Sequence, residues 1–314
     1  MFTSDNQRAS LFMVLAMAAF TLNDTIVKFA SETINVGQVM FVRGLFATFL
    51  VLLLAWQQRL LRNIKGLLHP MVWLRMAGEI GGTVTYIIAL AHLPLPNVAA
   101  IFQVLPLAVT VGAALFFGES VGWRRSFAIA VGFCGTLIIV RPGTEGFNAF
   151  SLLLLLCVVF CTVRDLATRR IPNEIPTLLV SSVTALTITL CGAVLMLPMG
   201  GWSPMTTELT GLLFACASFM LVGYIFIIKA MRTGEISAVA PFRYTTLIWA
   251  FALGYLVFGN VPDLYMLVGG AIIAGSGLYT LYRERLVSKK RMAAESIVSP
   301  TMAPTARHYL RLRP

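Results

Sequence analysis

Charge is scarce in this chain of 314 residues. Asp, Glu, Lys and Arg together make up 12% of the sequence, and the acids number only 13. Apolar residues make up 58%, and the mean hydropathy is +0.84. A soluble globular chain carries a charged fraction of roughly 25%. The scarcity of charge therefore excludes a soluble globular protein and predicts an integral membrane protein.

The signals of a catalytic or metal site are also lacking. The sequence has no phosphate-binding glycine loop and no nucleophile elbow. Its three histidines, His69, His92 and His308, fall at the ends of apolar runs or in the C-terminal tail. The five cysteines lie within apolar runs and show neither a disulfide framework nor zinc spacing: Cys134, Cys157, Cys161, Cys191 and Cys216. We therefore predict no enzyme, no metal and no cofactor. A membrane-embedded enzyme or a non-transporting membrane protein stays as the alternative from another class.

Long apolar runs fill most of the sequence. A helix needs roughly 20 predominantly apolar residues to cross a bilayer. Runs of this kind lie near 9–30, 35–56, 72–92, 97–117, 126–141, 149–168, 175–197, 208–230, 236–258 and 264–282. Their connections are too short to form a soluble domain. The pattern predicts an all-α polytopic membrane protein with ten transmembrane helices.

The 24 Lys and Arg residues are distributed unevenly between the two sides of these runs. If the N-terminus is cytoplasmic, 18 of them lie on the cytoplasmic side, Arg141 alone lies outside, and five lie within runs. Cytoplasmic connections of membrane proteins carry such an excess of bases. The distribution predicts that both termini are cytoplasmic, and it accounts for the net charge of +11 without a nucleic-acid partner.

The sequence matches itself when it is shifted by 141 residues. The segment SLFMVLAMAAFTLNDTIVK (10–28) falls on SLLLLLCVVFCTVRDLATR (151–169), and 97–119 falls on 238–260. Each half holds five runs, so the second half must enter the membrane in the opposite orientation. We predict an inverted 5+5 repeat with halves at 9–141 and 149–283. The basic tail at 284–314 is expected to be disordered.

Charged residues lie deep within the predicted spans. Each would cost about 2.5 to 3.5 kcal/mol at the bilayer centre if it were unpaired. We expect these residues to face one another or a polar path, and inverted repeats place the substrate site near the midplane between the halves. The six residues are Asp24, Arg43, Glu79, Arg164, Asp165 and Arg243.

On the first run, Asp24 lies too deep for its short side chain to reach the lipid headgroups. With Asn23 it is expected to face the helix bundle, either as part of the site or as the partner of a base. Lys28 lies four residues further on, so it either pairs with Asp24 or extends to the membrane surface. In the second half Arg164 and Asp165 occupy the matching positions.

On the third run, Arg75, Glu79, Gly82 and Tyr86 recur every three or four residues and form one stripe of a helix. Glu79 either lines the path or simply pairs with Arg75. The fourth run carries Gln103 near mid-span.

Two prolines mark expected helix irregularities, Pro106 on the fourth run and Pro241 on the ninth. The ninth run continues with Arg243 and Tyr244. Arg243 and Arg43 are the bases least able to reach the membrane surface. Each either binds a polar substrate or neutralises a buried acid, and both roles can coexist.

The chain resembles the EamA family of the drug/metabolite transporter superfamily. The resemblance rests on FVRGLFATFLVLLL (41–54) and on IIALAHLPLPNVAAIFQVLPLAVTVGAALFFGESVGWRRSFAIAVGFCGTLIIVRPG (87–143). Arg43, Pro106 and Glu119 match an arginine, a proline and a glutamate of the family pattern. The second half departs from that pattern, because Leu247 stands where a proline is common and Asn260 replaces the glutamate.

This resemblance implies ten helices around a central path, alternating access and a bacterial inner-membrane location. Residues 230–259 look like a subgroup that includes riboflavin transporters and S-adenosylmethionine carriers. Riboflavin uptake is the first choice, and an S-adenosylmethionine carrier or an amino-acid or metabolite exporter is the alternative. The expected partners are a small-molecule substrate and the lipid bilayer, with a homo-oligomer left open.

Overall fold

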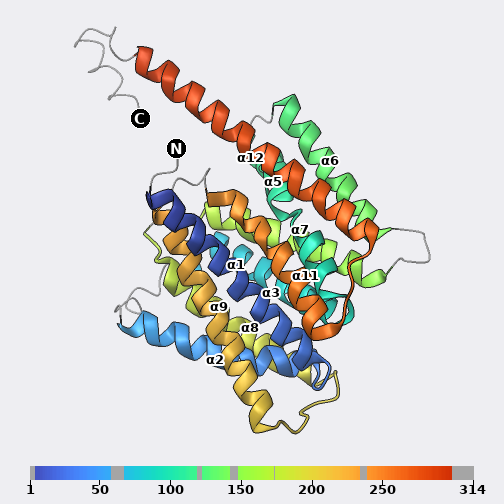
Figure 1. The fold of residues 1–314 in the computed structure, drawn as a ribbon. Coiled ribbons are helices and arrows are strands. Elements are labelled where there is room, and N and C mark those ends of the chain that lie inside the picture. The colour runs from blue at the N-terminus through green and yellow to red at the C-terminus, as the bar shows by residue number, and fades with distance from the viewer. Residues whose placement is uncertain are drawn as a thin grey trace.

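The computed structural model describes residues 4–57, 67–118, 122–141, 148–172, 174–233 and 239–298. All regular elements in these ranges are helices (Figure 1). They are α1 (Ser4–Ser31), α2 (Val36–Gln57), α3 (Pro70–His92), α4 (Leu95–Phe102), α5 (Leu105–Phe117), α6 (Trp123–Val140), α7 (Ala149–Arg169), α8 (Thr177–Met196), α9 (Thr207–Thr233), the 3₁₀ helix η3 (Ala240–Tyr244), α11 (Thr245–Phe258) and α12 (Leu264–Val298).

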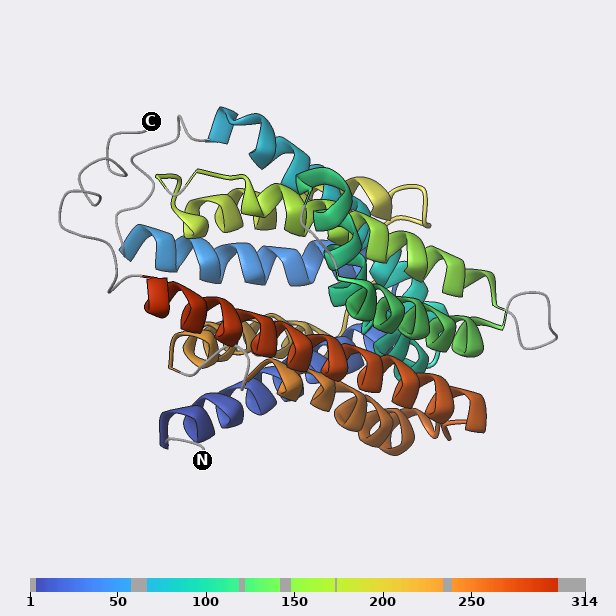
Figure 2. The ribbon, with the colours of Figure 1, turned by 90° about the horizontal axis from the view of Figure 1, so that it is seen from above.

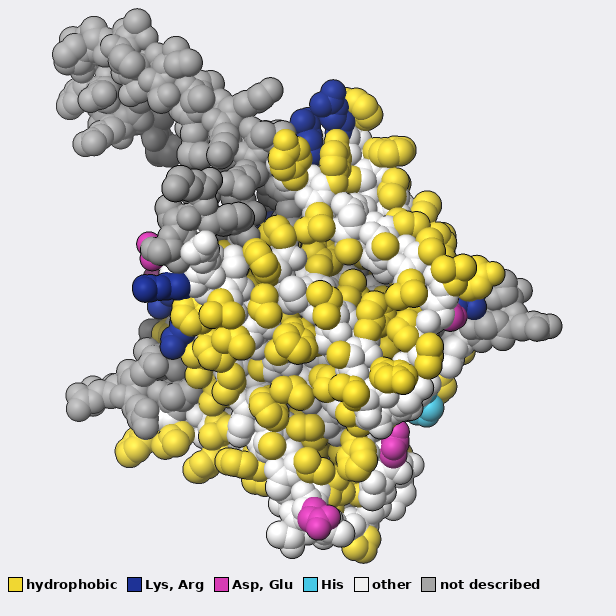
Figure 3. Space-filling view, in the orientation of Figure 1, with side chains coloured by type: hydrophobic (Ala, Val, Ile, Leu, Met, Phe, Trp, Pro, Cys, Tyr) yellow, Lys and Arg dark blue, Asp and Glu magenta, His cyan; other side chains and the backbone are white. Residues whose placement is uncertain are grey.

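Six segments within the described residues are long and apolar enough to cross a membrane: Asp5–Ser31, Val36–Leu53, Leu95–Phe117, Ala149–Arg169, Leu179–Met196 and Thr207–Thr233. Ser126–Val140 and Leu264–Thr280 are shorter apolar helices. Hydrophobic side chains cover the middle of the visible face, and charged side chains lie at its margins (Figure 3). The protein is therefore an all-helical, multi-pass membrane protein, while ten crossings remain a prediction.

One expectation about the C-terminal tail is wrong for part of its length. Helix α12 continues to Val298, so residues 284–298 are helical where the sequence was expected to be disordered. The segment RERLVSKKRMAAES is rich in Arg, Lys, Glu, Leu and Ala, which have high helix propensity. An apolar helix can therefore extend beyond the membrane without a break. Residues 299–314 lie outside the described part.

Each major helix pair joins one helix of the first half to one of the second. The most extensive packing joins α1 with α9, α2 with α8, α3 with α7 and α6 with α12 (Figures 1 and 2). The first residues of α1 and the last turns of α12 lie at the same end of the molecule. The halves are thus interleaved, and neither buries its helices alone.

Residues that differ by 141 in number meet or adopt the same conformation. The hydroxyl groups of Thr48 on α2 and Thr189 on α8 are 2.9 Å apart, and these two residues are 141 apart in the sequence. Gly118 and Gly259 end α5 and α11, and both have a φ of 66°. This left-handed conformation favours glycine, because a side chain would be strained there.

The α1–α9 and α3–α7 contacts also repeat. Gly82 of α3 packs on Cys161 of α7, and Gly223 of α9 packs on Phe20 of α1. Adding 141 to 82 gives 223, and adding it to 20 gives 161, so exchange of the halves converts one contact into the other. The sequence repeat therefore has a counterpart in packing.

The fourth apolar run is interrupted between α4 and α5. The N–H groups of Gln103 and Val104 bond three residues back, to Ala100 at 3.3 Å and Ile101 at 3.1 Å. Pro106 follows, and its ring nitrogen has no hydrogen to donate to the carbonyl four residues back. Pro241 lies in η3, directly before α11. Both sites expected to be irregular thus adjoin a change of helix.

An ion pair between Arg141 and Asp263 links the end of α6 to the start of α12, outside the apolar helices. Partial burial raises the pKa of Asp263, but the N–H of Met266 and the Arg141 guanidinium outweigh it. The pKa therefore lies below its ordinary value of 3.8. Met266 N donates to the carboxylate at 2.7 Å. The carboxylate also caps the first turn of α12.

Candidate functional site

Asp24 lies at the centre of a polar group that we call the Asp24 cluster: Asn23, Asp24, Arg43, Tyr86 and Cys216. Asn23 Nδ2 donates to Asp24 Oδ1 at 2.9 Å, and Tyr86 Oη donates to Asp24 Oδ2 at 2.7 Å. Arg43 interacts electrostatically with Asp24. The thiol of Cys216 is 3.0 Å from Asn23 Oδ1. Helices α1, α2, α3 and α9 therefore enclose one carboxylate with donors and a cation.

Local packing fixes the Asp24 cluster. The ring of Tyr86 meets the ring of Phe102 edge to face, with centroids 5.2 Å apart. One turn before Asp24, the Thr21 hydroxyl is 3.1 Å from that of Thr246 on α11. A tyrosine whose ring is already packed against a neighbouring ring loses little further freedom when it donates to a carboxylate. The hydroxyl is thus aimed at Asp24 by the helix packing around it.

A second group, the Glu79 cluster, contains Arg75, Glu79, Arg164, Asp165 and Thr184. Glu79 lies between two arginines, with Oε2 3.6 Å from Arg75 Nη2 and Oε1 3.4 Å from Arg164 Nη1. Arg164 Nε donates to Asp165 Oδ1 at 2.8 Å, and Arg75 Nη1 donates to the Thr184 hydroxyl at 2.8 Å. The two bases and two acids of the Glu79 cluster have no net formal charge. This arrangement lowers the cost of charge within the membrane.

Helix α3 connects the two clusters. Glu79 and Tyr86 are seven residues apart, which is two turns of helix, so they lie on one face about 10 Å apart. The clusters also correspond by the shift of 141, since Asn23 and Asp24 match Arg164 and Asp165. The predicted stripe on α3 therefore runs from one cluster to the other.

Of the residues predicted on the fourth and ninth runs, Gln103 contacts the backbone of Arg243, and Arg243 interacts with Asp165 of the Glu79 cluster. Gln103 is buried, and its Nε2 is 3.4 Å from the carbonyl oxygen of Arg243. The side chain of Arg243 is exposed and interacts electrostatically with Asp165. The hydroxyl of Tyr244 lies so close to Gly277 of α12 that a Cβ there would overlap it. Arg243 forms no ion pair within 4.0 Å among the described residues, so its charge stays available.

Lys28 is the main residue whose role the sequence did not reveal. It is only 8% exposed, and its Nζ donates to the carbonyl oxygens of Leu90 at 3.1 Å and Leu93 at 2.8 Å. Neither sequence alternative, pairing with Asp24 or extension to the surface, describes this geometry. The ammonium group instead satisfies carbonyls at the C-terminal end of α3, which carries partial negative charge.

Cys216 was also missed as a site residue. It occupies the position that matches Arg75 under the 141-residue shift, so the repeat contained a signal for it. Two further thiols, Cys157 and Cys161, lie between α3 and α7, with their sulfurs 3.9 Å apart. No group of three or more His, Cys, Asp or Glu side chains in the described part could hold a metal ion.

The model of the EamA-like transporter family matches residues 7–141 and again residues 149–282. The chain belongs to this family. The family model thus covers nearly all of both apolar halves, and the resemblance inferred from the sequence is confirmed.

Curated relatives of this EamA family member are named as transporters of different solutes. The pseudopaline exporter CntI of Pseudomonas aeruginosa strain UCBPP-PA14 is 29% identical over 275 residues, covering 84% of this chain and 92% of that protein. The S-adenosylmethionine uptake transporter of Rickettsia conorii is 24% identical over 288 residues, covering 89% and 94%. The riboflavin transporter of Brucella anthropi is 26% identical over 285 residues, covering 88% and 99%.

A solved crystal structure has the same fold, with a TM-score of 0.61 at 18% identity, covering 88% of this EamA chain and 98% of that one. At this identity the likeness concerns the fold alone. The family and the named relatives confirm a transporter rather than an enzyme. They share no single solute and no single direction of transport, so the substrate has to be argued from the site.

Proposed function

We propose that this EamA protein carries a small polar organic metabolite across the bacterial inner membrane by alternating access. The path runs between the Asp24 cluster and the Glu79 cluster. The observation that carries the proposal is that both clusters lie on one face of α3 and are completed by helices of both halves. Charges within a membrane are costly, and they commonly mark the path of a polar solute.

The transport mechanism in this proposal depends on ten crossings in an inverted 5+5 repeat, with halves at 9–141 and 149–283 and both termini in the cytoplasm. The Thr48–Thr189 contact supports it, because equivalent residues touch each other only near a two-fold axis that relates the halves. The paired contacts of Gly82 and Gly223 support it as well. In such transporters one group of helices rocks against the other around a central site.

The substrate class follows from the donors and acceptors along the path. Arg243 offers an exposed guanidinium, and Arg43 offers a second one beside Asp24. Asp165, whose side chain is 37% exposed, offers an acceptor. A solute that both donates and accepts hydrogen bonds fits this arrangement. Riboflavin has these properties without a net charge, and a relative of similar length is named a riboflavin transporter. It is therefore the first solute to test.

A zwitterionic solute is the second candidate, because acids and bases alternate along the path. Asp24 and Asp165 can hold a cationic group, while Arg43 and Arg243 can bind a carboxylate bidentately. S-adenosylmethionine carries both kinds of charge, and relatives from Rickettsia are named uptake transporters for it. A relative named as an exporter makes export of an amino acid or a related metabolite the third case to test.

Counterflow in proteoliposomes tests the proposal regardless of transport direction. Vesicles loaded with unlabelled riboflavin, S-adenosylmethionine or an amino acid are diluted into the labelled form of the same solute. For one of the three solutes, we expect more labelled solute to accumulate than in protein-free vesicles. Arg243→Ala should lower this accumulation at least about tenfold, as expected when a hydrogen bond to a charged group is lost. Lys229→Gln is the matched control, because Lys229 is exposed on α9 and belongs to neither cluster.

Two results would count against the proposal. If folded protein exchanges none of the three solutes, the substrate class is wrong. If exchange occurs but is the same in Arg243→Ala, in Asp24→Asn and in the control, the path does not pass the clusters. Size-exclusion profiles of each variant show whether a loss of exchange reflects misfolding.

A further inference from the structure

A polar hollow lies at the end of the molecule where α1, α3 and α11 end, and the described residues that line it belong to neither the Asp24 cluster nor the Glu79 cluster. Its volume is about 480 Å³. Pockets for small organic ligands commonly measure roughly 300 to 1,000 Å³. The polar residues that line it are Lys28, Glu32, His92 and Asn260. We call it the Lys28 hollow.

Lys28 brings one base with an unused donor to the hollow. Its ammonium group has three N–H groups and donates two hydrogen bonds, to the carbonyls of Leu90 and Leu93. The Nζ atom also lies 5.5 Å from the centroid of the Phe258 ring. These contacts hold the ammonium group at the wall of the hollow. One N–H group therefore remains for a further acceptor.

Glu32 brings an acid that does not pair directly with Lys28. It follows Lys28 by four residues, just beyond the end of α1, and it is exposed. The two side chains interact electrostatically. Within the described part of the chain, however, Glu32 forms no ion pair with a nitrogen within 4.0 Å. Opposite charges thus line one hollow with a gap between them, and a molecule that carries both charges can fill this gap.

Asn260 adds an amide side chain that forms no hydrogen bond to any described residue. It follows Gly259, which ends α11 in the left-handed conformation, and its backbone N–H bonds the carbonyl of Gly254 at 2.9 Å. The repeat makes this residue informative, because the shift of 141 takes Glu119 to Asn260. A glutamate here would give the hollow two acids and one base. The amide instead keeps the charges balanced and offers a donor to an anionic group.

His92 is held firmly at the wall of the hollow. Its ring stacks on the ring of Phe150, with centroids 4.0 Å apart, and its Nδ1 lies 2.8 Å from the carbonyl oxygen of Ile88. A ring nitrogen this close to a carbonyl oxygen donates to it, so Nε2 of the neutral ring is an acceptor. The hollow therefore combines acceptors with donors.

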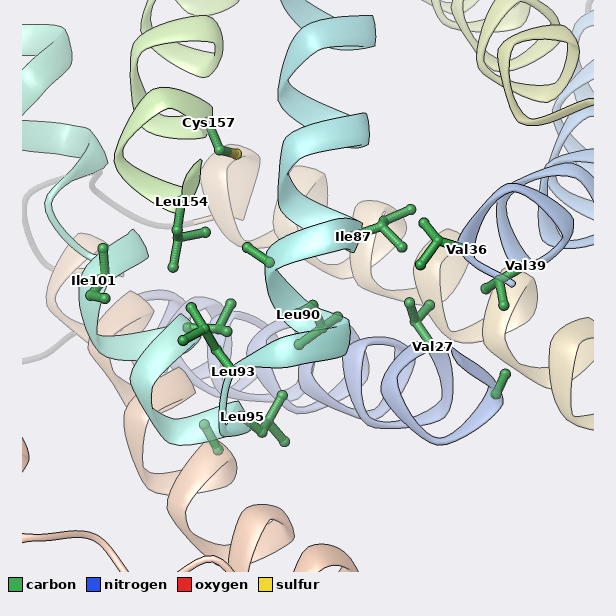
Figure 4. Close-up of a cluster of buried hydrophobic side chains, with 14 of the residues drawn as sticks. Val27, Val36, Val39, Ile87, Leu90, Leu93, Leu95, Ile101, Leu154 and Cys157 are labelled. Atoms are coloured by element: carbon green, nitrogen blue, oxygen red, sulfur yellow. The ribbon is translucent and has the colours of Figure 1, made fainter. Parts of the chain in front are cut away.

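The remaining wall of the hollow is apolar and includes Leu93, Val257 and Phe258. Leu93 belongs to a large cluster of buried side chains that also contains Val27 and Leu90 (Figure 4). Phe258 packs against the same cluster. Because a close-packed core gives way only at a cost, this wall is a fixed surface. It suits the apolar part of a ligand rather than its charged groups.

We propose that the Lys28 hollow is a binding site for an amino acid with a large apolar side chain. The carboxylate of the ligand accepts from Lys28 and Asn260, and its ammonium group donates to Glu32 and His92. Its side chain packs against the apolar wall beside Phe258. Both charges of the ligand and both charges of the hollow are then paired. The site is separate from the proposed path, so its occupation can be measured without transport.

Calorimetric titration of the purified full-length protein in detergent tests this site. L-phenylalanine is the probe, because it is a zwitterion whose ring can pack against Phe258. It should bind saturably, with one ligand per protein. 2-Phenylethylamine lacks the carboxylate and 3-phenylpropionate lacks the ammonium group. Each should bind at least about tenfold more weakly than L-phenylalanine, as expected when a hydrogen bond to a charged group is lost.

Two substitutions alter the hollow without changing either cluster. Glu32→Gln removes the anionic partner of the ligand, and Asn260→Glu adds a second acid to the hollow, so each should weaken binding at least about tenfold. Both residues lie just beyond a helix end, and melting temperatures show whether the variants are folded. Glu208→Gln is the matched control, because Glu208 is exposed in the first turn of α9 and does not line the hollow. Its affinity for L-phenylalanine should stay within about twofold of wild type.

The proposal is overturned if L-phenylalanine does not bind saturably, if the two analogues bind as tightly as it does, or if both hollow variants keep wild-type affinity. Loss of binding in Arg243→Ala but not in Glu32→Gln would place the amino acid in the proposed path, and this would also overturn the site. Binding that depends on Glu32, together with no counterflow, would keep the site and count against the path. Counterflow without such binding would do the reverse.

Discussion

Replacement of Gly78 by alanine tests a close helix contact beside the Glu79 cluster. Gly78 lies on α3 where this helix meets α7. A Cβ at this position would lie 2.8 Å from the carbonyl oxygen of Phe160 and 2.9 Å from the backbone nitrogen of Arg164. These atoms belong to the α7 backbone, so they cannot move away by a change of rotamer. The two helices must separate by several tenths of an ångström to admit the methyl group.

The structure sets the size of this effect. Overpacking of a tight contact costs about 1 to 3 kcal/mol. The higher helix propensity of alanine offsets up to about 1 kcal/mol of this cost. A net loss of about 1 to 2 kcal/mol corresponds to a fall of roughly 2 to 8 °C in the apparent melting temperature of a chain of this size. The separation also weakens the Arg164–Glu79 ion pair, whose atoms are 3.4 Å apart, so transport should fall together with stability.

Gly211→Ala provides the matched control. Gly211 also lies within a helix, α9, but nothing lies within 4 Å of a Cβ built there. Its replacement should leave the melting temperature unchanged or raise it slightly, since alanine favours the helix. Fluorescence-detected size exclusion after heating measures both variants in detergent. Equal melting temperatures of the two variants would show that the α3–α7 contact is not as close as described, and the steric reasoning would fail.

Three further outcomes are expected. Tyr86→Phe removes the donor to Asp24 and should reduce counterflow by about tenfold or more, with little change in melting temperature; unchanged counterflow would show that this bond does not support transport. The buried Gln38 side chain of α2 exchanges two hydrogen bonds with the backbone of Ser203. Gln38→Leu leaves these backbone groups unpaired and should cost about 1 to 3 kcal/mol, seen as a melting temperature lower by several degrees; an unchanged temperature would show that this amide does not stabilise the fold. Asp263 has a lowered pKa when folded, so its ionised form stabilises the protein above the ordinary pKa and loses this effect as pH falls through the lowered value. Asp263→Asn should therefore lower the melting temperature slightly at pH 7, by an amount equivalent to under about 1 kcal/mol because the side chain is exposed, and the difference should disappear as pH falls through the lowered pKa. A difference that persists at low pH would contradict this assignment.

Part of the site could be read from spacing alone. Arg75, Glu79 and Tyr86 were expected on one face of a helix, and α3 places them there because seven residues make two turns. The choice between partners could not be read in this way. Glu79 binds Arg75, as its i, i+4 spacing allows, and also binds Arg164 from a helix 85 residues away in sequence. Only packing of α3 on α7 brings these two charges together.

The partners of Lys28 could not be predicted from spacing either. Its spacing from Asp24 suggested a pair within one helix, but its ammonium binds backbone carbonyls 62 and 65 residues away. Backbone acceptors leave no trace in the sequence, because every residue carries one. Cys216 was not predicted as a site residue for a related reason, because a single thiol in an apolar run is usually only a small core residue.

By itself, the sequence determined the membrane environment, the helical class and the duplication. Each of these follows from composition and periodicity, since an apolar run must satisfy its backbone groups internally once water is absent. The tertiary structure alone decided which buried charges compensate one another and which backbone carbonyls bind Lys28. These depend on distances between helices far apart in the chain, and two states of one sequence can differ in them.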